Sequence, residues 1–205
     1  MIKIVDYGVG NVQAFLNLFK RLGIPADRAK NKEDVISSSK LILPGVGHFD
    51  HAMKKLNSSG MREALEKSVF DLKIPILGIC VGMQILANKS DEGILPGLGW
   101  VPAKVRAFSK NPESTNLSLP HMGWNTIDIN KSASLINKED EKLAQFYFLH
   151  SFYFDADDKE DILATSHYGF NFNAIVVHEN IYGVQFHPEK SHKWGEKLLK
   201  NFSKL

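Results

Sequence analysis

The order of apolar and polar positions divides the chain into two halves with different predicted structure. In the first half, short apolar runs typical of buried strands alternate with segments whose apolar residues recur at helical spacing. The predicted strands are residues 2–5, 41–43 and 74–79, and the predicted helices are 12–22, 52–70 and 81–88. Strands and helices that alternate with short connections indicate an α/β fold around a largely parallel sheet.

The second half is predicted to be rich in strands. The expected strands are 101–108, 126–129, 145–154, 161–167, 172–178 and 181–186, and a closing helix is expected over 196–202. The sequence contains no internal repeat, low-complexity stretch or linker. We therefore expect residues 1–205 to form a single α/β domain, with a mixed, largely parallel central sheet flanked by helices.

Composition narrows the function classes. The chain is 43% hydrophobic and 23% charged, with a net charge of +2 spread along its length, which gives no reason to expect a nucleic-acid or membrane surface. A single cysteine excludes an intramolecular disulfide and a multi-cysteine zinc site. No apolar run is long enough to span a membrane, and the first residues lack the pattern of a signal peptide. These features predict a cytoplasmic protein.

The single cysteine, Cys80, lies in a specific local pattern. An apolar strand leads into Gly78-Ile79-Cys80-Val81-Gly82, and a predicted helix follows. This is the cysteine version of the nucleophile elbow, a sharp turn whose flanking glycines avoid collisions with neighbouring backbone. The turn would expose the sulfur at the start of a helix, where the dipole favours thiolate, and the N–H of Val81 could donate to an oxyanion.

A lone cysteine in an apolar run is more often a small buried hydrophobic residue. The succession of strand, elbow and helix favours the nucleophile instead. A nucleophilic thiol also needs a base and a group that orients the base. His187 ends an apolar strand, and Glu189 lies two residues further on, where extended backbone would point both side chains the same way. His187 and Glu189 are therefore the candidate base and orienting acid.

Other polar clusters give weaker signals. The pairs His48 with His51 and His187 with His192 lack a complete ligand set at a diagnostic spacing, so we expect no metal. The turn after the first strand lacks the full dinucleotide fingerprint, and no Walker A motif is present, so we expect no cofactor.

Several segments, in the expected order along nearly the whole chain, resemble the class I (triad) glutamine amidotransferases. Pro120-His121-Met122-Gly123-Trp124-Asn125 is the most specific of them. The others are residues 6–11, 43–47, 78–84, 91–93, 97–100, 148–153 and 183–191. The resemblance implies a flavodoxin-like fold, with one amidotransferase type 1 domain over residues 1–205.

The resemblance also implies a reaction. Cys80 would attack the side-chain amide carbon of L-glutamine, His187 would take and return the proton, and Glu189 would orient His187. Val81 and the Gly45-Val46-Gly47 loop would line the oxyanion site. The positions that hold glutamine in this family correspond to Gln84, Glu92, His150 and Ser151.

The resemblance finally implies a partner. Released ammonia would pass to a (β/α)₈-barrel cyclase subunit, in a heterodimer that forms imidazole glycerol phosphate and aminoimidazole carboxamide ribotide in histidine biosynthesis. The stretch His192-Lys193-Trp194-Gly195 departs from this pattern and resembles paralogues that supply ammonia for sugar amidation in surface-polysaccharide biosynthesis. A cysteine hydrolase or peptidase, and a non-catalytic partner protein that has kept the fold, are the other classes considered.

Overall fold

A computed structural model describes residues 1–114, 116–140 and 144–205. Its main sheet has the strand order β2-β1-β3-β4-β13-β12-β10-β6-β5, and β11 and β8 extend it from β12. The strands are β1 Ile2–Val5, β2 Ala26–Ala29, β3 Lys40–Gly45, β4 Ile76–Cys80, β5 Lys89–Ser90, β6 Ala103–Ala107, β7 His121–Thr126, β8 Asp128–Ile129, β9 Gln145–His150, β10 Phe152–Ala156, β11 Ile162–Tyr168, β12 Phe170–His178 and β13 Ile181–Val184. Strands from β2 to β13 in this order pair in parallel, and those beyond β13 pair mostly antiparallel. The predicted single α/β domain with a mixed sheet is confirmed.

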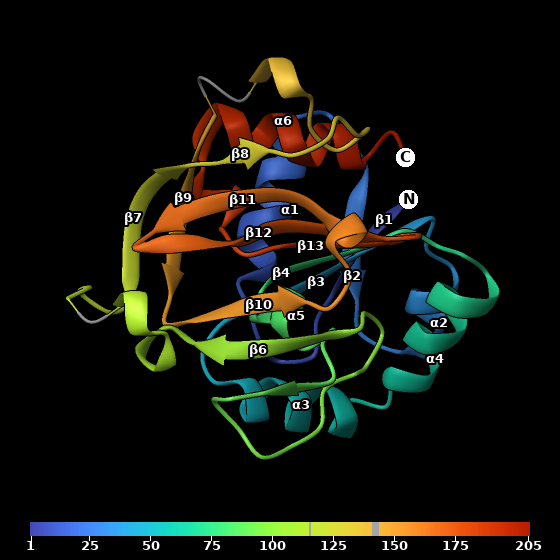
Figure 1. Ribbon diagram of the computed structural model, residues 1–205. Coiled ribbons are helices and arrows are strands. Elements are labelled where there is room, and N and C mark those ends of the chain that lie inside the picture. Colours follow the sequence, from blue (N-terminus) through green and yellow to red (C-terminus); the bar gives the residue numbers. More distant parts are fainter. Residues whose placement is uncertain (115, 141–143) are drawn as a thin grey trace.

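Helices cover both faces of the parallel strands (Figure 1). They are α1 Val12–Arg21, α2 Lys32–Ile36, α3 Phe49–Ser58, α4 Arg62–Glu66, α5 Val81–Gln84 and α6 His192–Phe202. A π-helical turn, Lys67–Asp71, continues α4. Short 3₁₀ turns are Phe108–Lys110, Pro112–Ser114, Lys138–Asp140, Lys159–Asp161 and Pro188–Lys190. α1 and α6 lie side by side and are joined by an ion pair of 2.9 Å between Arg21 and Glu196. α3 and α5 lie on the opposite face. The core between these layers is apolar, with fully buried Phe15 and Phe19 on α1.

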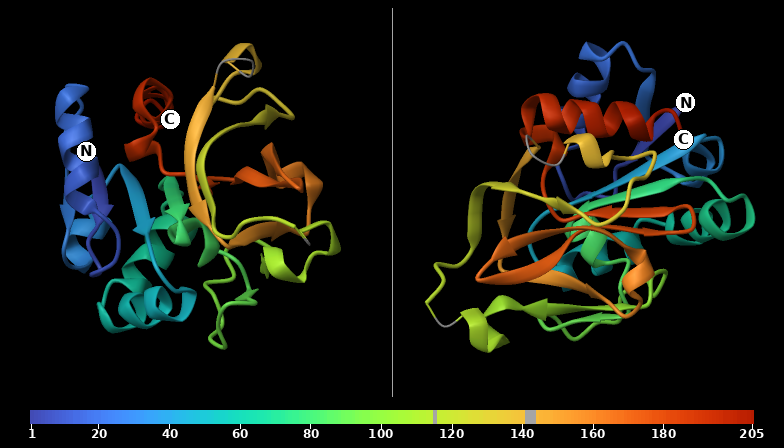
Figure 2. Two further views of the ribbon diagram at one scale, coloured as in Figure 1. Left: turned by 90° about the vertical axis from the view of Figure 1, so that its left-hand side faces the viewer. Right: turned by 45° about the horizontal axis from the view of Figure 1, so that its top comes forward.

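A second, two-stranded sheet stands apart from the main one. β7 and β9 pair antiparallel from His121 opposite His150 to Thr126 opposite Gln145. In Figure 2 they form a curved ribbon on the side away from the N-terminal helices. The N–H of His187 donates to the Tyr147 carbonyl at 2.9 Å, so the ribbon passes beside the carboxyl end of β13. The ribbon thereby closes one side of the space above the parallel strands.

The N-terminal half follows the predicted order, with two inaccurate helices and three omissions: β2, α2 and the two-residue strand β5. β2 and α2 were not predicted, because β2 is a polar edge strand and α2 has five residues, too few to show a helical period. The helix predicted over 52–70 is divided, because α3 ends at Ser58 and Gly60 takes a positive φ of 73°. The helix predicted over 81–88 is also too long, as described below.

The second half differs from the prediction in two places: the strand expected over 126–129 is β8 with the end of β7, whose first five residues were not expected to be a strand, and one predicted strand changes sheets. Residues 145–154 were expected to be continuous, but the chain leaves the β7–β9 ribbon at His150 and enters the main sheet at Phe152. Apolar residues on both sides of Ser151 conceal this break in the sequence pattern. The change of sheets brings His150 and Ser151 to the carboxyl end of the parallel strands.

Close backbone packing at one glycine gives a prediction for the fold. A Cβ on Gly82 would overlap the carbonyl oxygen of Leu43, a backbone atom that cannot move freely. Gly82→Ala should therefore lower the free energy of unfolding by about 3 kcal/mol. Gly23→Ala is the matched control, because Gly23 faces open space and adds only the cost of its φ of +67°, about 1 kcal/mol. Urea unfolding of the two variants measures this, and equal midpoints would contradict the prediction.

Candidate active site

Cys80 lies at the end of β4 in a backbone conformation that residues other than glycine rarely adopt. Its φ is +54° and its ψ is −112°, and α5 begins at the next residue. A non-glycine residue with a strained, positive φ on the turn from a strand to a helix is the geometry of a nucleophile elbow. The predicted elbow is therefore present, with the Cys80 side chain 4% exposed.

The glycines around the elbow are required by close packing. A Cβ on Gly78 would lie 2.6 Å from the carbonyl oxygen of Gly82, and a Cβ on Gly45 would overlap the backbone nitrogen of Gly82. Gly45 is the register partner of Cys80 between β3 and β4. Gly45 thus supports the back of the elbow, while the next residues of its loop, Val46 and Gly47, line the pocket in front.

The helix behind Cys80 is shorter than predicted. α5 ends at Gln84, because the carbonyls of Ile85, Leu86 and Ala87 accept hydrogen bonds from N–H groups of residues 98–101 instead of from a next helical turn. A single turn has a smaller dipole than a full helix. The expected contribution of the helix dipole to a thiolate is therefore reduced.

His187 and Glu189 form a buried pair beside the cysteine. Nδ1 of His187 lies 2.8 Å from Oε1 of Glu189, and the two side chains are 3% and 6% exposed. The contact does not arise from extended backbone as expected, because Pro188–Lys190 is a 3₁₀ turn that brings the Glu189 carboxylate to Nδ1 of the ring. With Nδ1 directed at Glu189, Nε2 is the ring nitrogen left for Cys80.

The charge state of His187 depends on both neighbours. Burial lowers its pKa, but hydrogen bonds to Cys80 and Glu189, together with the charges of these two groups, outweigh burial and raise the pKa to about 10. A buried histidine whose pKa is raised by a neighbouring cysteine and carboxylate is placed to accept and return the proton of a cysteine nucleophile.

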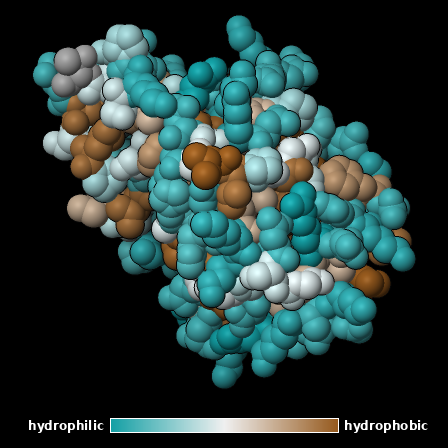
Figure 3. All heavy atoms as spheres, turned by 90° about the horizontal axis from the view of Figure 1, so that it is seen from below, coloured by the Kyte–Doolittle hydropathy of each residue, from teal (hydrophilic) through white to brown (hydrophobic). Residues whose placement is uncertain are grey.

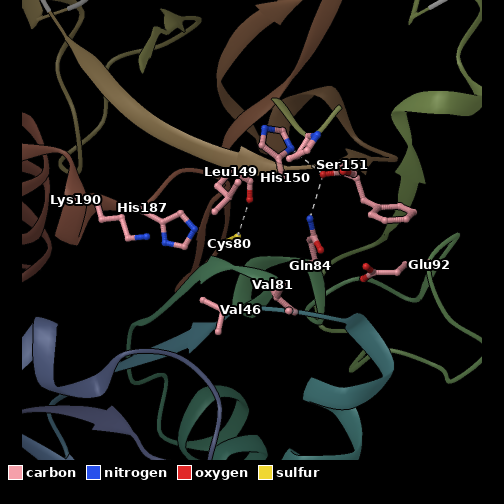
Figure 4. Close-up of a pocket in the computed structure, with 13 residues that line it drawn as sticks. Val46, Cys80, Val81, Gln84, Glu92, Leu149, His150, Ser151, His187 and Lys190 are labelled. Carbon is pink, nitrogen blue, oxygen red and sulfur yellow. Dashed lines mark hydrogen bonds between the residues drawn. The ribbon is translucent and has the colours of Figure 1, made fainter. Parts of the chain in front are cut away.

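The pocket above Cys80 has a volume of about 350 Å³, within the range of small-molecule sites. Of the predicted site residues, nine line it: Val46, Gly47, Cys80, Val81, Gln84, Glu92, His150, Ser151 and His187. Gly45 and Glu189 lie behind this lining and support it. Figure 4 shows residues from separate parts of the chain converging on the same space.

Polar side chains under the pocket are fixed by a chain of hydrogen bonds. Gln84 donates its Nε2 to the Phe152 carbonyl and to Oε1 of Gln185, both at 3.1 Å. Gln185 is fully buried and donates its own Nε2 to the Cys80 sulfur at 3.8 Å. Both donors of Gln84 are thus engaged, which leaves its carbonyl oxygen as the group for a ligand.

His150 lines the pocket, and both nitrogens of its ring are engaged by other groups of the protein. Nδ1 of His150 donates to the Phe152 carbonyl at 2.8 Å, so its Nε2 is the acceptor in a 3.0 Å bond with Nδ1 of His121. His121 is stacked on Tyr168 at 4.2 Å between ring centroids. Burial lowers the pKa of His121 to about 4 and that of His150 to about 3, so both rings are neutral at pH 7.

Sequence reasoning missed several residues at the site. Pro120, Leu149, Phe152 and Lys190 also line the pocket, and the Leu149 carbonyl accepts a hydrogen bond from the Cys80 thiol at 3.9 Å. A backbone carbonyl leaves no signal in a sequence. Gln185 did leave one, because it is an uncharged polar residue inside an otherwise apolar strand end.

Two kinds of feature are absent from the described part of the chain. Within residues 1–114, 116–140 and 144–205, no three His, Cys, Asp or Glu side chains gather closely enough to hold a metal ion. Across the same residues, no helix combines the length and apolar character needed to cross a bilayer.

Comparisons with known proteins identify the family of the chain. Residues 3–205 match the family model described as glutamine amidotransferase class-I. Over the full length of both chains, the sequence is 57% identical to "Imidazole glycerol phosphate synthase subunit HisH" of Bdellovibrio bacteriovorus and 47% identical to the subunit of the same name from Leptospira borgpetersenii. It is 42% identical, again over both full lengths, to a protein named "Imidazole glycerol phosphate synthase subunit HisH 2" from Pseudomonas aeruginosa.

Solved structures show the same fold at low identity. A crystal structure of a glutamine amidotransferase matches with a TM-score of 0.73 at 19% identity, covering 98% of this chain and 96% of that one. PurLQS from Thermotoga maritima matches with a TM-score of 0.72 at 15% identity, covering 99% of this chain and 97% of that one. The chain belongs to the class I glutamine amidotransferases and, within them, to the family of imidazole glycerol phosphate synthase subunit HisH.

The neutral pair of buried histidines predicts a loss of stability in acid. Folding lowers both pKa values, so below the ordinary value of 6.5 the unfolded chain binds protons that the folded chain does not. The free energy of unfolding should therefore fall between pH 6.5 and 4. In His121→Gln this fall should be shallower by up to about 1.4 kcal/mol per pH unit. Urea unfolding at several pH values measures both slopes, and identical slopes would rule the prediction out.

Proposed function

We propose that this chain hydrolyses L-glutamine to glutamate and ammonia, with Cys80 as nucleophile. The observation that carries the proposal is the buried Cys80–His187–Glu189 arrangement at the base of a pocket, in a chain that matches HisH subunits over its whole length. Cys80 attacks the amide carbon, and His187 delivers the proton with which ammonia leaves. Water then attacks the thioester, with His187 as base, and glutamate is released.

The oxyanion formed in each step needs donors in front of the elbow. The N–H of Val81 follows the nucleophile directly, and the Val46-Gly47 segment lines the same pocket, with Val46 near Val81 in Figure 4. Gly47 has a φ of +83°, and a Cβ at this position would meet nothing within 4 Å, so this segment has room to adjust its backbone. We propose these two segments as the oxyanion site.

We propose that the ammonia passes to a (β/α)₈-barrel cyclase subunit in histidine biosynthesis. Exposed apolar side chains beside the pocket suit a partner surface: Met122 is 65% exposed, Trp124 47% and Val46 46%. On the face seen in Figure 3, hydrophobic groups are separated by a mostly hydrophilic surface. A cytoplasmic location follows from this pathway and from the free thiol that the reaction needs.

Sugar amidation is the less favoured assignment. The relatives reported above carry the name of the imidazole glycerol phosphate synthase subunit. His192 belongs to the stretch that departs from the histidine-pathway pattern. Its ring stacks on Trp124, with ring centroids 5.1 Å apart, so it is part of the surface proposed for the partner and not of the pocket lining.

Replacing the nucleophile tests the reaction. Cys80→Ala should lower ammonia release from glutamine at least about 10³-fold, because the covalent route is lost. The complex of this variant with the cyclase subunit should still form product from added ammonium salt, which controls for folding and assembly. Retention of glutamine-dependent synthesis would show that Cys80 is not the nucleophile.

Replacing the orienting acid tests the proposed triad. Glu189→Gln removes the charge that helps to raise the pKa of His187, so NMR titration of His187 should give a value below that of the wild type. The kcat for glutamine should fall by about 10²-fold or more. Glu196→Gln, on the surface of α6, is the control and should change neither quantity. An unchanged His187 titration in Glu189→Gln would remove Glu189 from the triad.

A further inference from the structure

Asp50 joins helix α3 to the loop that carries Glu92. It lies in the first turn of α3, outside the lining of the pocket, and its two carboxylate oxygens accept the N–H groups of Ile94 and Leu95, each at 3.1 Å. These N–H groups belong to the residues that directly follow Glu92 and Gly93. The carboxylate therefore fixes the backbone on one side of Glu92.

A second contact between the same helix and loop fixes Glu92 itself. The N–H of Phe49, the residue before Asp50, donates to Oε2 of Glu92 at 2.7 Å. On the other side of the loop, the N–H of Glu92 donates to the Ser90 hydroxyl at 3.1 Å. Backbone and carboxylate of Glu92 are both held, and the start of α3 supplies the support.

Position 93 must be glycine for the Asp50 carboxylate to fit beside it. A Cβ at position 93 would overlap the Asp50 carboxylate, and its Cγ would lie 2.5 Å away. The absence of a side chain at Gly93 is what allows the carboxylate to reach the two N–H groups beyond it. Asp50 and Gly93 thus act as one complementary pair.

The residue held in this way faces the substrate space. Glu92 lines the same pocket as Cys80 and Gln84, and Figure 4 shows its carboxylate directed toward Gln84. One of its oxygens is engaged by the Phe49 N–H, which leaves negative charge for a ligand. In the proposed substrate the group of opposite charge is the α-ammonium of glutamine.

We propose that Asp50 is a positioning residue that holds Glu92 for the α-ammonium of glutamine. It thereby sets the preference of the site for an amino-acid amide over the same amide without an amino group. This inference rests on the proposed glutaminase function. Asp50 does not contact the substrate and acts through the loop at Gly93.

The test compares two amides in the complex of the full chain with the cyclase subunit. Ammonia release is measured from L-glutamine and from glutaramate, which is glutamine without its α-amino group. In Asp50→Ala we expect the KM for glutamine to rise about tenfold, with kcat within about twofold, because substrate binding is weakened rather than the chemistry. The kcat/KM for glutaramate should stay within about twofold of wild type, because that substrate has no ammonium to lose.

Variants of the partner glycine make the test specific. Gly93→Ala alone should lower the preference for glutamine, whereas Gly93→Ala combined with Asp50→Ala should be no worse than Asp50→Ala, because the overlap has been removed. Glu92→Gln should abolish the preference directly. Asp158→Ala is the control, since Asp158 also accepts a loop N–H, that of Glu160 at 2.9 Å, and should leave both substrates unchanged.

The possible outcomes distinguish a failure of the role proposed for Asp50 from a failure of the proposed glutaminase function. Equal losses with both substrates in Asp50→Ala would show a general structural role and overturn the inference, as would an unchanged preference. A wild-type complex that hydrolyses both amides equally well would overturn the inference and leave the glutaminase function standing. A wild-type complex that releases no ammonia from glutamine would refute the proposed function and the inference together.

Discussion

The contact between two backbone segments, at Gly82 and at Leu43 in the neighbouring strand, is the constraint on which the site depends. The turn after β4 presses so closely on β3 that no side chain fits between them. That closeness holds Cys80 at its unfavourable positive φ, because the surrounding strands leave the turn no other path. This one backbone contact fixes the turn that directs the Cys80 thiol and begins α5. It also places the Val46-Gly47 segment, which follows β3, beside the thiol.

Residues far apart in the sequence complete the site, and each arrives by a different structural route. β13 lies next to β4 in parallel, which brings His187 to the end of the sheet where Cys80 lies. The 3₁₀ turn at Pro188 then places Glu189 behind the ring. The change of sheets at Ser151 brings in the Leu149 carbonyl and the His150 ring. The central strands set the position of the nucleophile, and the irregular segments supply the groups around it.

The sequence alone predicted structure correctly where a local steric rule applies. It failed where contacts between residues far apart in the chain decide where an element ends. The glycine spacing around Cys80 predicted the elbow, because a Cβ on Gly78 would collide with the backbone of Gly82 in the same turn, whereas the contact of Gly82 with Leu43 became known only from the fold. The end of α5 was not predictable, since N–H groups of residues 98–101 bind the carbonyls of residues 85–87 that a longer helix would use. The division of residues 145–154 into two strands was hidden by apolar positions that suit either sheet. The roles of Gln185 and Asp50 became visible once their partners were placed beside them.

The solitary thiol has a consequence for the response of the chain to oxidants. Peroxide converts a reactive thiolate to a sulfenic acid, which a neighbouring cysteine often traps as a disulfide. This chain has one cysteine, so no such internal trap is possible. Recovery of an oxidised Cys80 therefore requires a small thiol from solution to reach the sulfur through the pocket. The same opening that would admit substrate would then also admit the reductant, and a partner seated over it would protect the thiol and delay its repair.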